Sequence, residues 1–543
     1  MTVAVLSEQS ETLRFLAERA TYGTRSPVHR IDTHGAIVFL AGDRAYKLKR
    51  AVRLPYLDFS TSEKRFAACA AEIAVNRRTA PDLYLGVAPV RAMRGALSLG
   101  PVREPRRVTR RDKGRAVDWV VVMRRFSDDA VYDRIAARGS LDQAEVAAIA
   151  EAIARFHIAA PKVASAARSR SIAWVIRGND AAIATHVPRV FRRSDARMLA
   201  RRSQAALRRV AALLARRRRQ GFVRHVHGDL HLRNICRIDG RPVLFDALEF
   251  DTRLATVDVL YDLAFLLMDM VHRRLHIEAN RLLNDYLARV VDPEDPTPLA
   301  GLAALPLFMS ARAAIRAHTE ATAANSQANW TARVARIADA RRYLALACGL
   351  LQPSAPVLVA IGGLSGSGKT TLARALAPSV GAAPGALVLR SDTIRKRLAG
   401  VDALSRLPPE TYTKHASAHV YRTIEELTLV ALRARRAVIA DAVFADTAER
   451  AAIETVARRA GVPFIGIWLE APQSTMTGRL VSRRGDASDA TPAVLARQLT
   501  YDLGGITWKR LAAGRAAKDV VQSAHRVLSR NARRIGGGPR LFS

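Results

Sequence analysis

Two aspartates and an asparagine near the middle of the chain have the types and spacing that phosphoryl transfer requires. Asp229 and Asn234 lie five residues apart in the segment 226–234, VHGDLHLRN, and Asp246 ends the apolar run 243–245. A carboxylate can accept the proton of an attacking hydroxyl, and a second carboxylate and an amide oxygen can bind Mg²⁺. The pattern therefore predicts Asp229 as a base and Asn234 and Asp246 as Mg²⁺ ligands beside ATP.

A glycine-rich segment near residue 365 predicts a second phosphate site. Residues 363–370 read GLSGSGKT and fit G-x-x-x-x-G-K-[ST] between an apolar strand, 357–361, and a helical stretch, 371–377. Glycines let backbone N–H groups approach phosphate closely, and the helix N-terminus adds partial positive charge. We expect the lysine to reach the β- and γ-phosphates and the threonine to hold Mg²⁺. The predicted ATP-binding residues here are Gly363, Leu364, Ser365, Gly366, Ser367, Gly368, Lys369, Thr370 and Thr371.

Three further segments favour a kinase over other nucleotide-binding proteins. Asp392 and Arg395 follow the apolar run 386–389, which would place a base and a phosphate-orienting guanidinium at a strand end. Asp441 ends a second apolar strand, 437–441, where a carboxylate can act on Mg²⁺. Arg479 and Arg483 lie four residues apart on one expected helix face and suit a mobile lid. The competing interpretations are a helix N-cap for Asp392, a turn residue for Asp441 and ordinary surface charge for the arginines.

The pattern H-G-D-x-H-x-x-N resembles the aminoglycoside phosphotransferase family and, more widely, choline-kinase-like and protein-kinase-like enzymes. The resemblance implies that Lys47, on an expected strand, pairs with phosphate and that Glu72, on an expected helix, is its ion-pair partner. It places Met123 at the hinge near adenine. Lys49 points to the same face as Lys47, because strand side chains alternate, so the choice between them stays open.

Two further features of this region match the phosphotransferase resemblance, and one departs from it. The helix ending at His157 matches it, and Asp262 resembles the family's structural aspartate behind the site. The turn 33–36 is the best candidate for covering phosphate, since no protein-kinase-type glycine loop is visible. We interpret His227 and His231 as structural, and Glu249 stays open between a metal or supporting role and the surface.

Residues from about 356 to 511 resemble the small P-loop kinases grouped with polynucleotide kinase, gluconate kinase and zeta-type toxins. This resemblance implies the hydroxyl-activating role of Asp392, a phosphate or substrate contact for Arg395, and lid roles for Arg479 and Arg483. Residues 488–490 and Gln498 are weaker candidates for holding the lid. A chain that carries both resemblances in this order is similar to a bacterial group of bifunctional proteins.

The strands and helices expected around these residues indicate a chain of mixed α/β and α+β class with two domains. Residues 1–350 would form a two-lobed kinase-like fold, and residues 351–543 a P-loop domain with a parallel sheet flanked by helices. We expect strands at 37–40, 45–49 and 118–123, and helices at 63–78, 185–219 and 299–350. A capping box at 140–143 would open a helix whose apolar face carries Val146, Ile149, Ile153 and Phe156.

Composition narrows the class of protein. The chain has 543 residues and a net charge of +37, spread as 58 basic against 35 acidic residues in 1–349 and 28 against 14 in 350–543. Aromatic residues are only 6% of the chain, so nucleic acid is less favoured as a partner than a small molecule, and the basic 185–219 region is interpreted as a solvated face. The three scattered cysteines, the start of the chain and the lack of long apolar windows predict a cytoplasmic protein with no membrane span.

These patterns support one function ahead of two alternatives. A tandem kinase would transfer the γ-phosphate of ATP, with Mg²⁺, to hydroxyl groups of small molecules. Alternatively, the C-terminal half phosphorylates a nucleic-acid 5′-hydroxyl, or the N-terminal half is a pseudokinase that makes the protein an ATP-binding regulator. The acceptors and the oligomeric state are not predicted.

Overall fold

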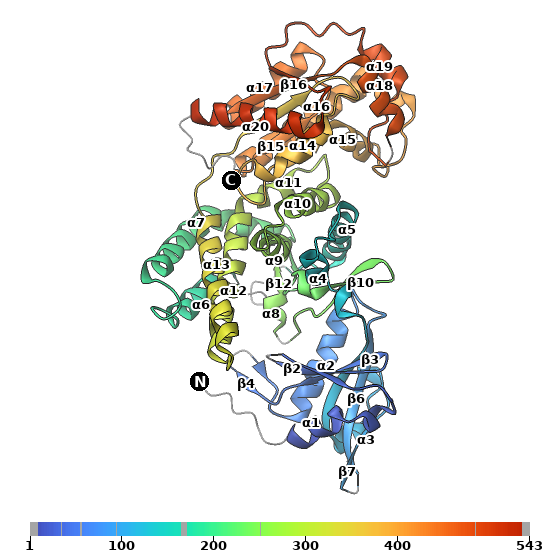
Figure 1. Ribbon diagram of the computed structural model, residues 1–543, viewed down its shortest axis with the longest axis vertical. Helices are drawn as coiled ribbons and strands as arrows, with labels where there is room; N and C mark the ends of the chain where they lie inside the picture. The colour runs from blue at the N-terminus through green and yellow to red at the C-terminus, as the bar shows by residue number, and fades with distance from the viewer. Residues whose placement is uncertain are drawn as a thin grey trace. The chain divides into compact units, whose positions relative to one another are not determined.

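The computed structural model describes residues 9–33, 35–54, 57–93, 95–163, 171–249, 251–483 and 485–534. The fold divides into two compact units, Met1–Ser171 with Gly221–Leu266 and Ile172–Gln220 with Leu267–Ser543. Figure 1 shows the elements of each along the colour gradient. The mixed α/β and α+β class is confirmed, whereas the boundary at 350/351 lies within the second unit and stays a prediction.

The first unit begins with a six-stranded antiparallel sheet in the order β1-β2-β3-β8-β6-β7. Alternating apolar residues of β2, β3 and β8 form one face with Leu16, while Cys69 and Ile73 of helix α2 cover the other. The expected strands and helix are all present. Their bounds are β1 His29–Asp32, β2 Ala36–Ala41, β3 Arg44–Lys49, β6 Tyr84–Met93, β7 Ala96–Leu99, β8 Ala116–Arg124, α1 Ser10–Ala17 and α2 Ser62–Asn76.

The rest of the first unit consists of short hairpins and helices. Helix α5 (Gln143–Ala159) buries Val146, Ile149, Ile153 and Phe156 as predicted. The expected capping box is wrong, because Asp142 is the N-cap and accepts the N–H of Glu145 at 2.8 Å. Other elements of this unit are α4 Tyr132–Ala137, the antiparallel pair β9 Val223–His225 and β12 Thr256–Asp258, and the hairpin β10 Ile235–Ile238 with β11 Arg241–Leu244.

The helical part of the second unit differs from expectation in two places. The region 185–219 is helical only from Arg193, because residues 185–192 form a turn, with the cis Val187–Pro188 bond, between α6 (Ile172–Ala184) and α7 (Arg193–Arg219). The region 299–350 is likewise split, at Asn329, which caps the second of two helices by accepting the N–H of Ala332. Those helices are α12 Leu305–Asn325 and α13 Trp330–Leu350, and α10 spans His276–Val290.

One apolar stretch of this unit, Thr297–Asn325, has the length and composition of a membrane span. In its apolar 18-residue window, 72% of the stretch is buried inside the protein, as in a core helix.

The P-loop part of the second unit is a five-stranded parallel sheet in the order β14-β15-β13-β16-β17 (Figure 1). Val359 and Ile361 of the central strand pack with α14 and α20 in one layer, and buried residues of α16 and α17 cover the opposite face. Parallel strands are buried on both faces in this way, which explains their continuous apolar runs. The bounds are β13 Leu358–Gly362, β14 Leu387–Arg390, β15 Val438–Asp441, β16 Phe464–Glu470, β17 Lys509–Ala512, α14 Lys369–Leu376, α15 Ser391–Leu398, α16 Lys414–Arg433, α17 Thr447–Ala460, α18 Gln473–Ser482, α19 Pro492–Gln498 and α20 Ala517–Arg534.

The edge strand β14 is completed by side chains of α10 instead of by another strand. The Asn284 amide accepts the N–H of Val388 at 2.7 Å and donates to the carbonyl of Ala386 at 3.1 Å. Asn280 donates to the same carbonyl at 3.0 Å. Because residues 386 and 388 are the pair that a neighbouring strand would bond, Asn284 substitutes for that strand.

Candidate functional sites

The segment between β9 and β10 brings together the predicted base and its amide partner. Asn234 donates its side-chain N–H to Asp229 Oδ2 at 3.0 Å and to the Asp229 carbonyl at 2.9 Å. His231 Nε2 lies 3.4 Å from Asp229 Oδ2. Asp262, fully buried, accepts the backbone N–H groups of His227 and Gly228 at 3.2 and 2.8 Å and so holds the loop from behind. The structural interpretation of His227 agrees with its bond to the Phe245 carbonyl at 2.9 Å.

The loop that carries Asp246 is held in a specific backbone conformation. Asp246 has φ 59°, in the left-handed region that non-glycine residues seldom adopt. Its N–H donates to the Tyr84 hydroxyl at 3.1 Å, and the next N–H, of Ala247, donates to Asn76 Oδ1 at 2.8 Å. Sequence reasoning missed Tyr84 and Asn76, because neither belongs to a motif and both act from other elements.

Two lysines of β3 share one buried glutamate of α2. Lys47 Nζ lies 2.8 Å from Glu72 Oε1 and 2.5 Å from Asp246 Oδ1, whereas Lys49 Nζ lies 2.5 Å from Glu72 Oε2 and also contacts Glu249. Burial opposes the charge of Glu72, but Lys47 and Lys49 lower its pKa to about 2. Lys47 therefore links Glu72 to the candidate metal ligand, and the side chain of Lys49 is only 2% exposed. Glu249, left open by the sequence, joins this network.

The remaining predicted residues of this site lie on the sheet. Met123 pairs with Ala45 across β8 and β3, at the end where β8 leaves the sheet. The candidate covering turn connects β1 to β2, where Thr33 Oγ1 donates to the Ala36 carbonyl at 2.8 Å. His34 of that turn lies outside the described residues.

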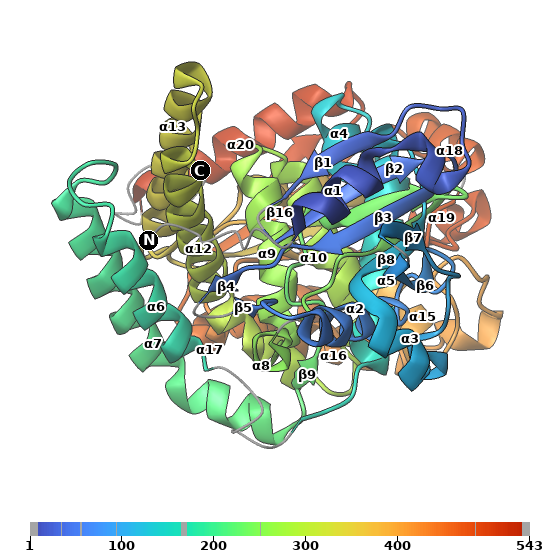
Figure 2. The ribbon, with the colours of Figure 1, turned by 90° about the horizontal axis from the view of Figure 1, so that it is seen from below.

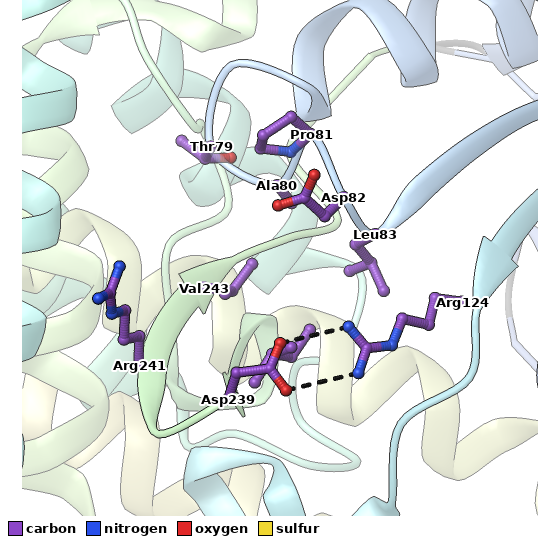
Figure 3. Close-up of a pocket in the computed structure, with 10 residues that line it drawn as sticks. Thr79, Ala80, Pro81, Asp82, Leu83, Arg124, Asp239, Arg241 and Val243 are labelled. Atoms are coloured by element: carbon purple, nitrogen blue, oxygen red, sulfur yellow. Dashed lines mark hydrogen bonds and ion pairs between the residues drawn. The ribbon is translucent and has the colours of Figure 1, made fainter.

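A pocket of about 320 Å³ lies next to this site, but none of the predicted ATP-binding residues lines it. It is formed by the α2–β6 connection, 79–83, by the end of β8 and by the β10–β11 hairpin. Figure 3 shows Arg124 and Asp239 facing each other across it, with 3.3 Å between guanidinium and carboxylate. Leu83 is buried in its wall.

The P-loop has the geometry that its sequence predicts. Gly366 has φ 81°, and a Cβ there would lie 2.6 Å from the Met476 carbonyl oxygen, so a side chain is excluded. Gly368, with φ 97°, precedes α14, whose first residue is Lys369. Lys369 Nζ donates to the Leu364 carbonyl at 3.1 Å, and burial lowers its pKa, although Asp441 and Asp392 act to raise it.

Carboxylates at the ends of two neighbouring strands meet beside this loop. Thr370 Oγ1 donates to Asp441 Oδ2 at 2.6 Å, and Arg390 Nε lies 3.6 Å from the same oxygen. Asp392 is in the first turn of α15, directly after β14. Burial raises its pKa and Arg390 opposes that rise, while Asp441 adds to it. A carboxylate with a raised pKa can act as a base, while the neighbouring carboxylate, in contact with Thr370, can hold a metal.

The predicted lid arginines are not on one helix face. Helix α18 ends at Ser482, so Arg479 is helical while Arg483 follows in extended conformation. Arg479 donates to the carbonyls of Ser367 and Ala513 at 3.2 and 2.9 Å and so holds the P-loop backbone. The i, i+4 expectation failed because the helix stops before Gly485 and the residues after it turn back toward β14.

Arg395 is placed by the segment that precedes α16. It donates to the Thr411 carbonyl at 2.9 Å and to Ser417 Oγ at 3.2 Å. Its guanidinium also lies over the Tyr412 ring, 4.8 Å from the centroid. These contacts keep a positive charge on the same helix as Asp392, one turn further on.

Three polar residues that the sequence did not single out contact the segment that follows α18, which we call the lid segment. Lys396, 1% exposed, donates to Asp489 Oδ1 at 2.9 Å, and Tyr412 donates to Asp489 Oδ2 at 2.7 Å. Asp486 accepts from Arg390 at 2.9 Å. Gln498, a weak candidate from sequence, accepts the N–H of Ser365 at 2.8 Å. Asp489 belongs to the segment 488–490, a weak candidate from sequence for holding the lid, whereas Lys396, Tyr412 and Asp486 were not predicted.

Both sites fit Mg²⁺-bound ATP by their own geometry. In the P-loop, Ser367 Oγ is buried and has no hydrogen-bond partner among the described residues, which a phosphate oxygen would supply. Thr370 and Asp441 form the hydroxyl and carboxylate pair that holds Mg²⁺ in such loops. In the first unit, Lys47 already contacts Asp246, so the phosphate-pairing charge lies beside the candidate metal ligand.

Known families cover both sites. The sequence model described as a phosphotransferase enzyme family matches residues 95–302, which include Asp229, Asn234 and Asp246. A model described as an AAA domain matches residues 358–501, which include the P-loop, Asp392 and Asp441.

Relatives align with this chain over most of its length. Uncharacterized proteins of Mycobacterium tuberculosis and Mycobacterium bovis are 30% identical to this chain over 485 residues, which is 87% of this chain and 90% of each relative. The chain belongs to their family. It joins a phosphotransferase-family region to a P-loop kinase region, and it is an enzyme of the kinase type with an alcohol group as acceptor. At this level its function is ATP-dependent phosphotransfer to a small molecule.

Solved structures of kinases are similar to parts of the chain. A gluconokinase from Sinorhizobium meliloti 1021 is 21% identical, with a TM-score of 0.25, and covers 33% of this chain and 95% of its own length. A choline/ethanolamine kinase family protein from Mesorhizobium loti is 15% identical, with a TM-score of 0.35, and covers 63% of this chain and 99% of its own.

Proposed function

We propose that the protein is a tandem kinase in which each half binds Mg²⁺-bound ATP and transfers the γ-phosphate to a hydroxyl of a small molecule. One observation supports the proposal above others. A lysine, a candidate metal-binding carboxylate and a candidate base occur together twice, as Lys47, Asp246 and Asp229 and as Lys369, Asp441 and Asp392. We assign the two halves to residues 1–350 and 351–543 and place the protein in the cytoplasm, consistent with its three free, buried cysteines.

In the first site, Asp229 is the base. Its Oδ2 accepts from Asn234, so the carboxylate is oriented before a substrate binds. An acceptor hydroxyl within hydrogen-bond reach would pass its proton to this carboxylate as the oxygen attacks the γ-phosphorus. Glu72 positions Lys47, whose positive charge would pair with phosphate. Mg²⁺, when bound, would neutralise the charge of the phosphate oxygens.

In the second site, Asp392 is the base. Its raised pKa makes it a stronger proton acceptor than an ordinary carboxylate. Thr370 and Asp441 would hold Mg²⁺, Lys369 would contact the β- and γ-phosphates, and Arg395 would contact the acceptor or its phosphate. Arg479 supports this site by fixing the P-loop backbone, and Arg483 follows it as a phosphate contact from the lid.

The decisive experiment is a count of ATP-binding events. Mg²⁺-ATP binding by calorimetry and ATP hydrolysis are measured for the wild type, Lys369→Ala, Asp246→Ala and the double variant. Two binding events in the wild type, one in each single variant and none in the double variant are expected. If Lys369→Ala removes all binding, the first half is a pseudokinase and the protein is an ATP-binding regulator.

The acceptor of the second half is tested separately. Labelled phosphate is followed from ATP to sugars, amino alcohols and a 5′-hydroxyl oligonucleotide. The proposal expects transfer to a small molecule. Transfer to the oligonucleotide alone would instead identify a nucleic-acid 5′-hydroxyl kinase.

A further inference from the structure

Helix α7 separates its residues into an apolar side and a side of arginines. Its buried residues, Leu199, Ser203, Ala206, Val210 and Arg217, fall within about 60° on a helical projection. Seven arginines fall on the opposite side, within about 160°, and all are exposed. We call them the arginine face: Arg193, Arg197, Arg201, Arg208, Arg209, Arg216 and Arg219.

The arginine face is not neutralised by the protein. Within the ranges that the structure describes, none of the seven guanidinium groups forms a hydrogen bond or an ion pair. Asp195 is the one acidic residue in the helix sequence. Some exposed arginines elsewhere are paired, for example Arg138 with Asp129 and Arg253 with Asp251.

The arginine face is long. Helix α7 has 27 residues and so extends over about 40 Å, because each residue adds about 1.5 Å. It packs against α6, α12 and α13, which Figure 2 shows running beside it. These contacts leave the arginine side outward. Guanidinium groups bind phosphate oxygens in a planar, two-point geometry, so an extended row of them fits an extended row of phosphates.

We propose that the arginine face of α7 binds the phosphate backbone of a nucleic-acid duplex. No residue of the arginine face belongs to either predicted kinase site, so the proposal does not depend on which molecule those sites phosphorylate. About 40 Å corresponds to roughly one turn of a duplex, whose helical repeat is about 34–36 Å. Binding would be independent of base sequence, because the face offers charge to phosphates and no array of base-reading groups.

Two other anionic partners fit the face less well. A membrane surface requires apolar side chains that enter the lipid, and the apolar side of α7 is occupied by neighbouring helices. A single strand requires aromatic side chains on which bases stack, and the sequence of α7 contains none.

The test compares two full-length variants of equal charge. In the first, Arg197, Arg201, Arg208, Arg209 and Arg216 are replaced by Gln. In the control, five other exposed arginines without an ion pair are replaced by Gln, namely Arg106, Arg107, Arg110, Arg526 and Arg530. Binding of a labelled 30-base-pair DNA duplex is measured by anisotropy from 50 to 200 mM salt. Duplex RNA, a single strand, polyglutamate and phosphatidylserine vesicles are the comparison ligands.

The wild type is expected to bind duplexes with affinity that falls steeply with salt. The α7 variant should bind at least tenfold more weakly at 50 mM salt, and the slope of log K against log salt should become shallower by about 2 to 4, since each lost phosphate contact removes about 0.9. The control variant should change affinity less than threefold. ATP hydrolysis should be unchanged in both variants, which separates this result from a loss of kinase function.

Three results would overturn the proposal. The first is equal weakening in both variants, which would assign binding to net charge alone. The second is tighter binding to vesicles, polyglutamate or the single strand than to duplexes, which would assign the face to another partner. The third is an absence of duplex binding by the wild type at 50 mM salt.

Discussion

At the scale of single residues, the two lysines of β3 have different partners, although their spacing in the sequence did not distinguish their roles. Both contact Glu72, but Lys47 reaches the candidate metal ligand Asp246, whereas Lys49 reaches Glu249. We therefore assign Lys47 to ATP and Lys49 to support of Glu72. Buried charges are stable in such sites only while each has its partner.

This assignment predicts different consequences for the two lysines. Lys47→Ala should abolish ATP binding in the first half, because it removes the phosphate contact. Lys49→Met should instead cost about 3–5 kcal/mol of unfolding free energy, since it leaves Glu249 buried without a partner. The double variant Lys49→Met/Glu249→Gln should recover much of that loss in denaturant unfolding. A double variant no more stable than Lys49→Met would contradict the pairing.

The protonation of Asp392 predicts the pH dependence of the second half. A base acts only when deprotonated, so turnover should fall as pH decreases through a pKa above that of an ordinary carboxylate. Arg390 lowers that pKa, so Arg390→Gln should move the acid limb of the profile of kcat/KM to higher pH. Asp392→Asn should lower kcat by about 10²–10⁴-fold with ATP binding retained. An acid limb unmoved in Arg390→Gln would argue against Asp392 as the base.

At the scale of elements, the lid segment is fastened to α15 by a buried ion pair. Lys396 lies on the face of α15 away from solvent, and Asp489 accepts from it, from Tyr412 and from the N–H of Leu407 at 3.1 Å. The lid and the helix that carries Asp392 are therefore held together before any substrate binds.

Breaking the ion pair between Lys396 and Asp489 should weaken acceptor binding in the second site without changing its chemistry. Asp489→Asn should raise KM for the acceptor more than it lowers kcat and destabilise the protein by about 3 kcal/mol, because Lys396 stays buried. Tyr412→Phe, which removes one hydrogen bond, is the milder control and should cost about 1 kcal/mol. Steady-state kinetics and thermal unfolding measure both. Equal effects of the two changes would show that the ion pair contributes little.

At the scale of the whole molecule, the P-loop sheet depends on a helix from far upstream in the chain. Asn280 and Asn284 of α10 satisfy the outer edge of β14, which leads directly to Arg390 and Asp392. A P-loop fragment that starts at residue 351 would expose this edge, and exposed edges promote association with other strands.

The fragment 351–543 should therefore be less soluble and less active than the full chain, whereas 267–543 should keep the P-loop activity. Asn284→Ala in the full-length protein should cost about 1–3 kcal/mol of stability, because the N–H of Val388 loses its partner. Size-exclusion chromatography and ATP binding by each fragment check this. A monomeric, ATP-binding 351–543 fragment would show that α10 is dispensable.

The sequence by itself determined the groups that can do chemistry. The P-loop, the segment 226–234 and the carboxylates at strand ends were found because their function constrains residues that are close together along the chain. The strands were found for the same reason, since their apolar runs are local. The helix ends were less well placed, as at 185–219, 299–350 and Arg483, because caps and turns depend on single residues such as Asn329.

Only the tertiary structure decided which groups meet. The choice between Lys47 and Lys49, the support of Asp246 by Tyr84 and Asn76, and the completion of β14 by Asn284 all join residues more than 20 positions apart. The arginine face belongs here too, because the sequence favoured a solvated charge run and packing revealed which side stays outward. Such contacts depend on how separate elements fold back on each other, and no local pattern encodes that.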